Sequence, residues 1–350
     1  MQIVSFAAAG LAVLGIAVAT PRLASADPAP VISGPQVHEN LAVYFIHGPS
    51  APGPVPLTLQ EALAKGSVRV LETGEVNELK IENTGGEDIF IQSGDIVKGG
   101  RQDRVLTMSF VLPPKSGEVA LAAFCVEHGR WSARGEEDSA AFASANEAIP
   151  SRIAKLAMRA PRATLAPAPS PDDGPTSDVY SRQQEVWASV ASTQSVLSQN
   201  LAAAVASPSS ETSLQLTLEN DKLQKARAAY VEALQADGEA KDDIVGYVFA
   251  INGRIGSADV YPSNALFRKM WPKQLAAGVT EAIGEVGNGR TEAPAPEAAA
   301  QFLQAAEQGS SHEEVVNDLS RQEVHDADKG LYVEARRSDG AWIHRNYLAK

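Results

Sequence analysis

Hydrophobic and polar residues alternate with a period of two between Ser67 and Val126. This alternation is typical of strands that bury one face. Turns rich in Gly and Pro, such as Gly99-Gly100, separate the runs. The predicted strands cover residues 68–72, 76–83, 89–97, 105–112 and 119–126. Short strands at this spacing predict an antiparallel sandwich or small barrel.

After residue 133 the spacing becomes helical, with hydrophobic residues four or seven positions apart, as at Val186, Val190 and Leu197. Helices are predicted at 134–158, 182–205, 214–236, 265–283, 302–308 and 313–321. Two hairpins interrupt them, at 244–261 and 330–347. The predicted fold class is therefore α+β, with an antiparallel β-rich N-terminal half and a mainly helical second half that carries two hairpins.

Two linkers rich in Pro and Ala, at 159–178 and 286–300, divide the chain. They give the predicted organisation: a signal peptide at 1–26, a lead-in at 27–36, a β-rich domain with flanking helices at 37–158, a helical and hairpin part of the same domain at 179–285, and C-terminal helices with a hairpin at 301–350.

The first 26 residues predict export. An apolar run over 3–19 is followed by Pro21 and by the sequence Ala-Ser-Ala that ends at Ala26, which is the pattern of a secretory signal cleaved after Ala26. The alternative is an uncleaved membrane anchor, because the run approaches the length that spans a bilayer. The helix-breaking proline and the small residues favour cleavage, so we expect a periplasmic or secreted protein without a stable membrane anchor.

The composition restricts which partners and cofactors are expected. The formal net charge is −13 at pH 7, and nucleic acid is bound through clustered Lys and Arg, so we expect no nucleic-acid partner. Cys125 is the only cysteine, which excludes an intramolecular disulfide. The six histidines form no metal-binding motif, so the sequence predicts no metal and no cofactor. Protein partners cannot be predicted from this composition.

The densest polar stretch, residues 93–104, gathers cations around one glycine turn. Glycine lets a ligand approach backbone amides, and arginine presents a planar fork to two oxygens, so the stretch predicts a site for an anion or sugar phosphate. The candidate ligand-binding residues here are Lys98, Gly99, Gly100, Arg101, Gln102 and Arg104. The alternative is a solvated hairpin tip whose charged side chains pair with one another.

A second stretch, residues 124–131, adds Arg130 and Trp131 as candidate ligand contacts. It also places Cys125 near Glu127, a combination that can serve as nucleophile and base. The alternative is a buried thiol, because free cysteine is among the most buried residue types, beside a Glu127–Arg130 ion pair. Asp95 is the other candidate acid or base.

The two stretches together resemble a known family, the ARG and rhodanese-phosphatase-superfamily-associated protein domain. The resemblance lies in the sequences NEL at 77–79, GDIVKGGRQDRVL at 94–106 and FCVEHGRW at 124–131, and less closely in 58–66, 244–255 and 266–275. It covers most of residues 37–285. It implies association with ADP-ribosylglycohydrolase-type and rhodanese-phosphatase-type proteins, hence nucleotide, ADP-ribose or phosphate chemistry, and one site shared by the two stretches.

Three functions remain open on this sequence. The first is an exported, non-enzymatic binding module for a small anionic ligand such as a phosphate, nucleotide or sugar. The second is a hydrolase that acts on an ADP-ribose-like or phosphoester substrate, with Glu127 or Asp95 as acid or base. The third is a structural envelope protein whose motif residues only brace the sheet.

Overall fold

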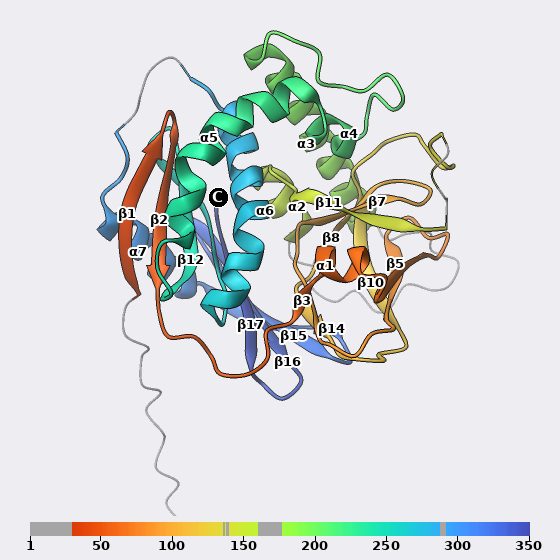
Figure 1. Ribbon diagram of the computed structural model, residues 1–350, viewed down its shortest axis with the longest axis horizontal. Coiled ribbons are helices and arrows are strands. Elements are labelled where there is room, and N and C mark those ends of the chain that lie inside the picture. Colours follow the sequence, from red (N-terminus) through yellow and green to blue (C-terminus); the bar gives the residue numbers. More distant parts are fainter. Residues whose placement is uncertain (1–29, 136, 138–139, 160–176, 288–291) are drawn as a thin grey trace, which may run out of the picture.

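The computed structural model describes residues 30–135, 137, 140–159, 177–287 and 292–350. Within them, 17 strands form three sheets, and seven helices pack on these sheets (Figure 1). Strands occur along the whole chain, so the prediction of a mainly helical second half is wrong. The predicted signal peptide, nearly all of the 159–178 linker and part of the 286–300 linker lie outside the described residues.

The largest layer is an eight-stranded antiparallel sheet in the order β1-β2-β12-β13-β17-β16-β15-β14. It joins distant parts of the chain, because β2 pairs with β12 and β13 pairs with β17. Both predicted hairpins are confirmed, as β12–β13 and β16–β17. The strands are β1 Val31–His38, β2 Leu41–His47, β12 Ile244–Ile251, β13 Arg254–Val260, β14 Ser310–Asn317, β15 Ser320–Ala327, β16 Gly330–Arg337 and β17 Trp342–Ala349.

The predicted β-rich region forms two smaller sheets. The runs 89–97 and 105–112 are each divided between them, the first at Gly94, whose φ is +93°. The six-stranded sheet has the order β11-β7-β8-β10-β5-β4, with β4 Val68–Glu72, β5 Glu78–Asn83, β7 Asp95–Gly99, β8 Arg104–Leu106, β10 Glu118–Cys125 and β11 Phe142–Ala148. The three-stranded sheet has the order β3-β6-β9, with β3 Leu57–Thr58, β6 Ile89–Ile91 and β9 Phe110–Leu112.

Helices cover both faces of the large sheet (Figure 1). Alternate residues of β2 point to opposite sides, so Val43 and Phe45 pack in the core that contains α6, whereas Tyr44 and Ile46 pack in the core that contains α7. Helix α6 is buried along most of its length, because the large sheet, α5 and β11 surround it. The helices are α1 Leu59–Ala64, α2 Arg152–Arg159, α3 Ser177–Asn200, α4 Leu214–Leu218, α5 Asp221–Glu239, α6 Asn264–Gly284 and α7 Pro296–Glu307.

Local helix signals fail where a neighbouring strand completes a ladder. The predicted helix at 313–321 is instead part of the β14–β15 hairpin, where Arg321 forms a cross-strand ion pair with Glu313 at 2.8 Å. The predicted helix at 134–158 contains β11, which pairs with β7, and it is helical only in α2. The predicted helix at 214–236 is divided, since the Asn220 side chain caps a new helix, α5.

Strand β1 extends into the predicted lead-in. It tolerates Pro35 because β1 is an edge strand with a bulge between Ser33 and Gln36.

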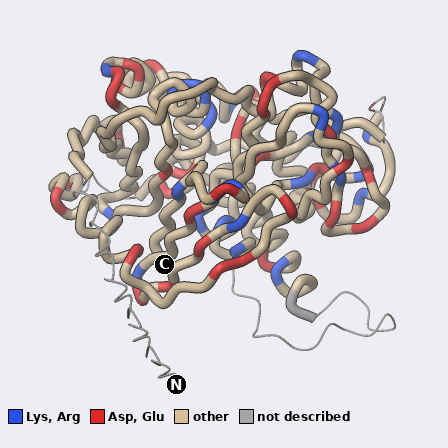
Figure 2. The backbone as a smooth tube through the Cα atoms, turned by 90° about the horizontal axis from the view of Figure 1, so that it is seen from below, with Lys and Arg blue, Asp and Glu red and all other residues tan. Residues whose placement is uncertain are grey.

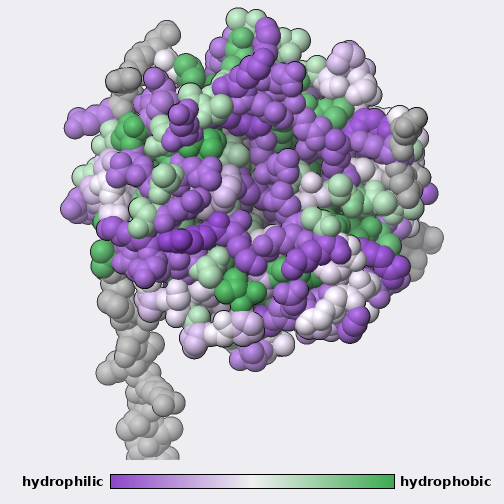
Figure 3. All heavy atoms as spheres, viewed as in Figure 1, coloured by the Kyte–Doolittle hydropathy of each residue, from purple (hydrophilic) through white to green (hydrophobic). Residues whose placement is uncertain are grey.

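None of the helices in the described part of the chain is long and apolar enough to cross a bilayer. The face shown in Figure 3 is mainly hydrophilic, with small separate hydrophobic areas.

Candidate functional site

The predicted cationic stretch forms the turn between β7 and β8, as expected for a glycine hairpin. Gly99 and Gly100 have φ values of +118° and +55°, a region that glycine occupies without strain. A Cβ on Gly100 would lie 2.2 Å from the Phe142 ring. The turn therefore needs glycine for its conformation and also for its close packing against β11.

Four side chains beneath this turn form a compact ionic group, here called the buried quartet: Asp103, Glu127, Arg130 and Arg134. Arg134 donates to Asp103 Oδ2 at 2.9 Å, and Arg130 Nη2 lies 2.7 Å from Glu127 Oε2. The two carboxylates are fully buried, and the two guanidinium groups are at most 10 % exposed. Arg130 also donates to the Gly100 carbonyl at 3.1 Å. The two predicted stretches therefore meet in one place.

Serine hydroxyl groups cover the quartet from the segment between α3 and α4. Ser213 donates to Asp103 Oδ2 at 2.8 Å, and Ser210 donates to Glu127 Oε1. Burial opposes ionisation of Glu127, but hydrogen bonds from Arg130 and Ser210 and the charge of Arg130 outweigh it and lower the pKa of this carboxyl. Glu127 is held as an anion within an ion pair, which does not favour a role as general acid.

A second group lies beside the quartet and is more open. Trp131 is 41 % exposed, and the guanidinium carbons of Arg101 and Arg104 lie 5.6 Å and 5.5 Å from its ring centroid, which is within cation–π range. Arg104 itself is fully buried, and its Nε and Nη2 atoms have no hydrogen-bond partner among the described residues. Its Nη2 lies 3.7 Å from Glu72 Oε1, beyond hydrogen-bond distance.

Other predicted site residues lie apart or serve the fold. Lys98 pairs with Glu219 of the α4–α5 junction at 2.8 Å. Asp95 is buried against Lys273 of α6, with 2.6 Å between Oδ1 and Nζ, so this motif residue ties the smaller sheet to the central helix. Gln102 is buried, and only its backbone carbonyl has a described bond, from Arg104 Nη1 at 2.8 Å.

Cys125 lies inside the protein and not in a reactive site. It is fully buried, and desolvation raises the pKa of its thiol to about 11. A thiol held neutral in this way is a poor nucleophile near pH 7. The geometry therefore favours the buried alternative for this residue.

The sequence did not indicate several members of the site. Arg134 was assigned to a helix, Glu72 to a strand end, and Ser213 lies 110 positions from Asp103 in the chain. Figure 2 shows Asp and Glu close to Lys and Arg along much of the backbone, which agrees with this local pairing. The carboxylates near these arginines were the signal in the sequence that could have identified the group, because buried arginines require carboxylates close by.

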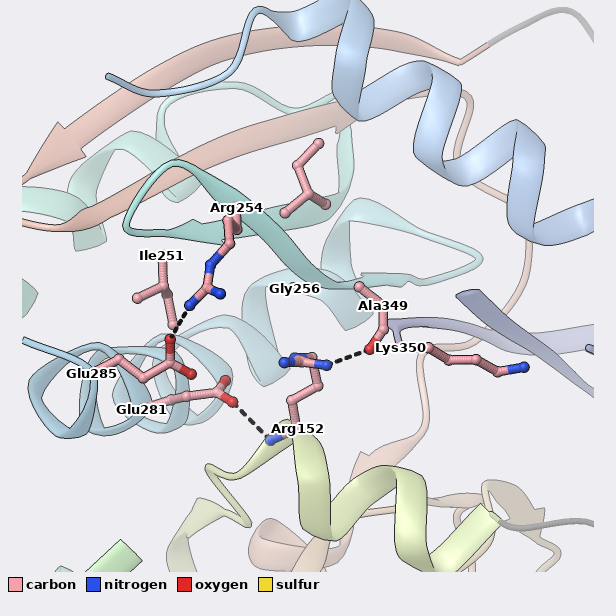
Figure 4. A pocket seen from close by; sticks show the side chains of 9 residues that line it. Arg152, Ile251, Arg254, Gly256, Glu281, Glu285, Ala349 and Lys350 are labelled. Atoms are coloured by element: carbon pink, nitrogen blue, oxygen red, sulfur yellow. Dashed lines mark hydrogen bonds and ion pairs between the residues drawn. The ribbon is translucent and has the colours of Figure 1, made fainter. Parts of the chain in front are cut away.

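Two hollows with defined linings lie elsewhere. One, of about 120 Å³, is bordered by the β12–β13 hairpin, α6 and the start of α2 (Figure 4). Its side chains are mostly engaged, since Arg152 donates to the Ala349 carbonyl and Arg254 faces Glu285 at 3.7 Å. Burial raises the pKa of Glu281, whose Oε1 accepts from the Arg152 backbone. The other hollow, of about 560 Å³, is shallow and lies at the β1 edge of the large sheet.

No group of three or more metal-ligating side chains occurs in the part of the chain that the structure describes. The fold and the site thus define an α+β protein built on mainly antiparallel sheets, with a buried arginine–carboxylate group under a glycine turn. The family model of the ARG and Rhodanese-Phosphatase-superfamily-associated Protein domain matches residues 30–348. The chain belongs to this family, which confirms the resemblance and extends it to the C-terminal strands. No curated protein and no solved structure gives a significant match.

Proposed function

We propose that this protein is an exported binding module that holds a small anionic ligand between Trp131 and the arginines behind it. The observation that carries the proposal is the Arg104 guanidinium, which is fully buried while two of its nitrogen atoms have no hydrogen-bond partner among the described residues. A buried polar group left without a partner costs about 1–3 kcal/mol, and more when it is charged. A ligand oxygen that accepted from Arg104 would recover that free energy.

The neighbouring groups extend the donor set. Arg130 Nε is also buried and without a partner, and the Arg101 side chain has no described hydrogen bond or ion pair, only its contact with Trp131. Planar guanidinium groups bind phosphate and carboxylate oxygens in pairs. Trp131 covers Arg104 and is partly exposed, so a ligand would enter by displacing the indole or by stacking on it.

Two features limit the ligand. The carboxylates of Glu72 and the buried quartet balance much of the positive charge, so a highly charged polyanion gains less here than a single phosphate group does. The family is described by association with the rhodanese-phosphatase superfamily, which supports a phosphate-bearing ligand. The charged groups of the buried quartet pair mainly with one another, so the quartet is expected to hold the site rigid and not to bind the ligand.

The test measures ligand binding by the protein purified without residues 1–26. Inorganic phosphate, ADP-ribose, sugar phosphates and nucleotides are titrated by calorimetry against the native chain, Arg101→Ala, Trp131→Ala and Arg104→Lys. We expect each substitution to weaken binding at least about tenfold, which corresponds to about 1.4 kcal/mol. Arg69→Ala is the matched control, because Arg69 is an exposed arginine paired with Glu82 on β4 and β5. Equal affinities in all variants, or no binding of any ligand, would contradict the proposal.

Export is part of the same proposal and has its own test. The pattern at Ala26 predicts that the mature chain begins at Asp27. N-terminal sequencing of protein recovered from the periplasm or culture medium should give Asp27 as the first residue. Recovery of only the full-length chain in membranes would favour the uncleaved anchor.

A further inference from the structure

A serine, a histidine and an aspartate meet at the larger hollow, and none of them belongs to the site described above. Ser33 Oγ lies 2.7 Å from His47 Nε2, and His47 Nδ1 lies 2.9 Å from Asp243 Oδ1. All three border the hollow of about 560 Å³. We call Ser33, His47 and Asp243 the surface trio.

The large sheet assembles the surface trio from β1, β2 and the turn that precedes β12. Val31 of β1 is directly opposite His47, so Ser33, two positions further on, is its diagonal neighbour on the same face. His47 is also opposite Ile244 of β12, and Asp243 immediately precedes that residue. The Gly48 amide donates to the Asp243 carbonyl at 2.9 Å and fixes the aspartate beside the histidine.

A bulge in β1 follows the serine directly. Gly34 has φ +106°, and a Cβ at this position would lie 2.9 Å from the Val43 carbonyl oxygen. Only glycine fits there, and the bulge ends the regular ladder between Ser33 and Gln36. Bulges of this kind re-aim a side chain at a strand edge.

The hydrogen bonds fix the direction of proton transfer. An ionised carboxylate only accepts, so His47 Nδ1 carries the proton and donates a hydrogen bond to Asp243, and Nε2 is left to accept from the Ser33 hydroxyl group. The hydrogen bond from His47 lowers the pKa of Asp243, which keeps this carboxyl ionised. A hydroxyl group bonded to an imidazole that a carboxylate orients is the arrangement of an activated serine nucleophile.

We propose that the surface trio is a second functional site, which hydrolyses small esters through Ser33. The Ser33 oxygen attacks the carbonyl carbon while its proton passes to His47 Nε2. The bond from that carbon to the alkoxy oxygen then breaks, and the alcohol leaves with the proton from His47. Water, deprotonated by His47, attacks the acyl–Ser33 ester and releases the acid, and the proton on His47 returns to Ser33.

The lining indicates the class of ester. Val31 and Pro49 supply apolar surface, and Lys241 is the cation on the lining. The Lys241 ammonium group has no hydrogen bond or ion pair within the described residues. It can therefore bind a negative group on the substrate or the oxyanion that forms during attack. The site fits a short-chain ester that carries a carboxylate.

The chain contains its own structural control. Ser109 Oγ lies 3.0 Å from His344 Nδ1, and His344 Nε2 lies 2.9 Å from Asp259 Oδ1. We call these residues the buried trio, because each is at most 2 % exposed. The same three residue types occur here without access to solvent, so the buried trio is not expected to react with a substrate.

The experiment uses a fluorophosphonate probe, which forms an Oγ–P bond to an activated serine as fluoride leaves, followed by peptide mapping by mass spectrometry. We expect label on Ser33 of the native chain, no label in Ser33→Ala, and at least about 100-fold slower labelling in His47→Gln. The exposed Ser338→Ala is the matched control and should label like the native chain. Hydrolysis of p-nitrophenyl acetate and of a succinate monoester should follow the same order.

No label on native protein that circular dichroism shows to be folded, or label that persists in Ser33→Ala, would overturn the proposal. So would labelling of His47→Gln at the native rate. The inference is independent of ligand binding at Trp131, because Arg101→Ala is expected to leave Ser33 labelling unchanged. Loss of either function alone therefore identifies which proposal has failed.

Discussion

The surface trio and the buried trio use the same three residue types in opposite surroundings. In the buried trio the carboxylate is saturated, because Asp259 also accepts from Asn346 at 2.9 Å and from Tyr247. In the surface trio the aspartate has one described side-chain partner and is 56 % exposed on its side chain. A hydrogen-bonded group in the core specifies packing. The same group beside a hollow keeps unused hydrogen-bonding positions that a substrate can occupy.

Removal of the buried carboxylate is expected to have the largest effect on stability. Asp259→Ala removes the carboxylate that His344, Asn346 and Tyr247 share, so we expect the free energy of unfolding to fall by about 3–5 kcal/mol. Asp243→Ala, the matched change at the surface, should leave it nearly unchanged. Urea denaturation monitored by tryptophan fluorescence measures both. Equal losses would show that the two surroundings do not differ as described.

Substitution of the buried serine should also destabilise the protein more than substitution of the surface serine, with a smaller difference than for the two aspartates. Ser109 Oγ bonds His344 and also accepts from the Ser93 amide at 2.9 Å, so Ser109→Ala should cost about 1–3 kcal/mol. Ser33→Ala should stay within about 0.5 kcal/mol, as at most surface positions. Differential scanning calorimetry gives the two shifts in Tm. A large loss in Ser33→Ala would assign that serine to the fold.

The pH dependence of stability should show the contribution of the buried aspartate. Burial opposes ionisation of Asp259, but the hydrogen bond and charge of His344 outweigh it and lower its pKa in the folded state. Its contribution is therefore fully present above the unfolded pKa of about 3.9 and is lost as the pH falls through the lower folded value. Unfolding from about pH 2 to 7 should show this loss in the native chain and not in Asp259→Asn.

Salt provides the control for that measurement. The hydrogen bond from His47 also lowers the pKa of Asp243, but this carboxyl is solvent-exposed. About 0.5 M salt should remove the Asp243 contribution and leave that of Asp259. If salt removed both contributions equally, the buried trio would have to be open to solvent.

The smallest expected effect concerns Lys241, the cation on the lining of the hollow. Lys241→Ala should lower kcat/KM for an anionic ester about fivefold relative to a neutral ester, as expected for a screened charge interaction of about 1 kcal/mol. The free energy of unfolding should not change. The two esters are compared in one spectrophotometric assay. An equal decrease for both would assign Lys241 to the oxyanion instead of substrate selection.

The sequence predicted those parts of the protein that depend on neighbours along the chain. The glycine turn and both long hairpins follow from local patterns, whereas the meeting of the two polar stretches was implied by the family resemblance. The structure contains all of them. The prediction of a helix at 313–321 is wrong because pairing between β14 and β15 overrode the local helical spacing. The same physical reason explains why the second half is not mainly helical as predicted, since pairing in the large sheet joins strands from both ends of the chain.

The surface trio could not be predicted, because its members meet only through strand register. His47 lies 196 positions from Asp243. Ser33 faces His47 only because the bulge at Gly34 follows it and does not precede it. A shift of one residue would turn the serine to the other face of the sheet. Of the buried quartet, Glu127 and Arg130 were candidate site residues on the sequence, whereas Arg134 and the serines that cover the quartet were not.

The surface trio can form during folding only after β2 has paired with β12. The hairpin of β1 and β2 closes locally and quickly, but the histidine acquires its carboxylate only after a long loop has closed. Non-local pairing of this kind is slow during folding. Until that loop closes, the hairpin of β1 and β2 can place Ser33 beside His47 only without the orienting group. Recovery of probe labelling after dilution from urea would then record the closing of the large sheet.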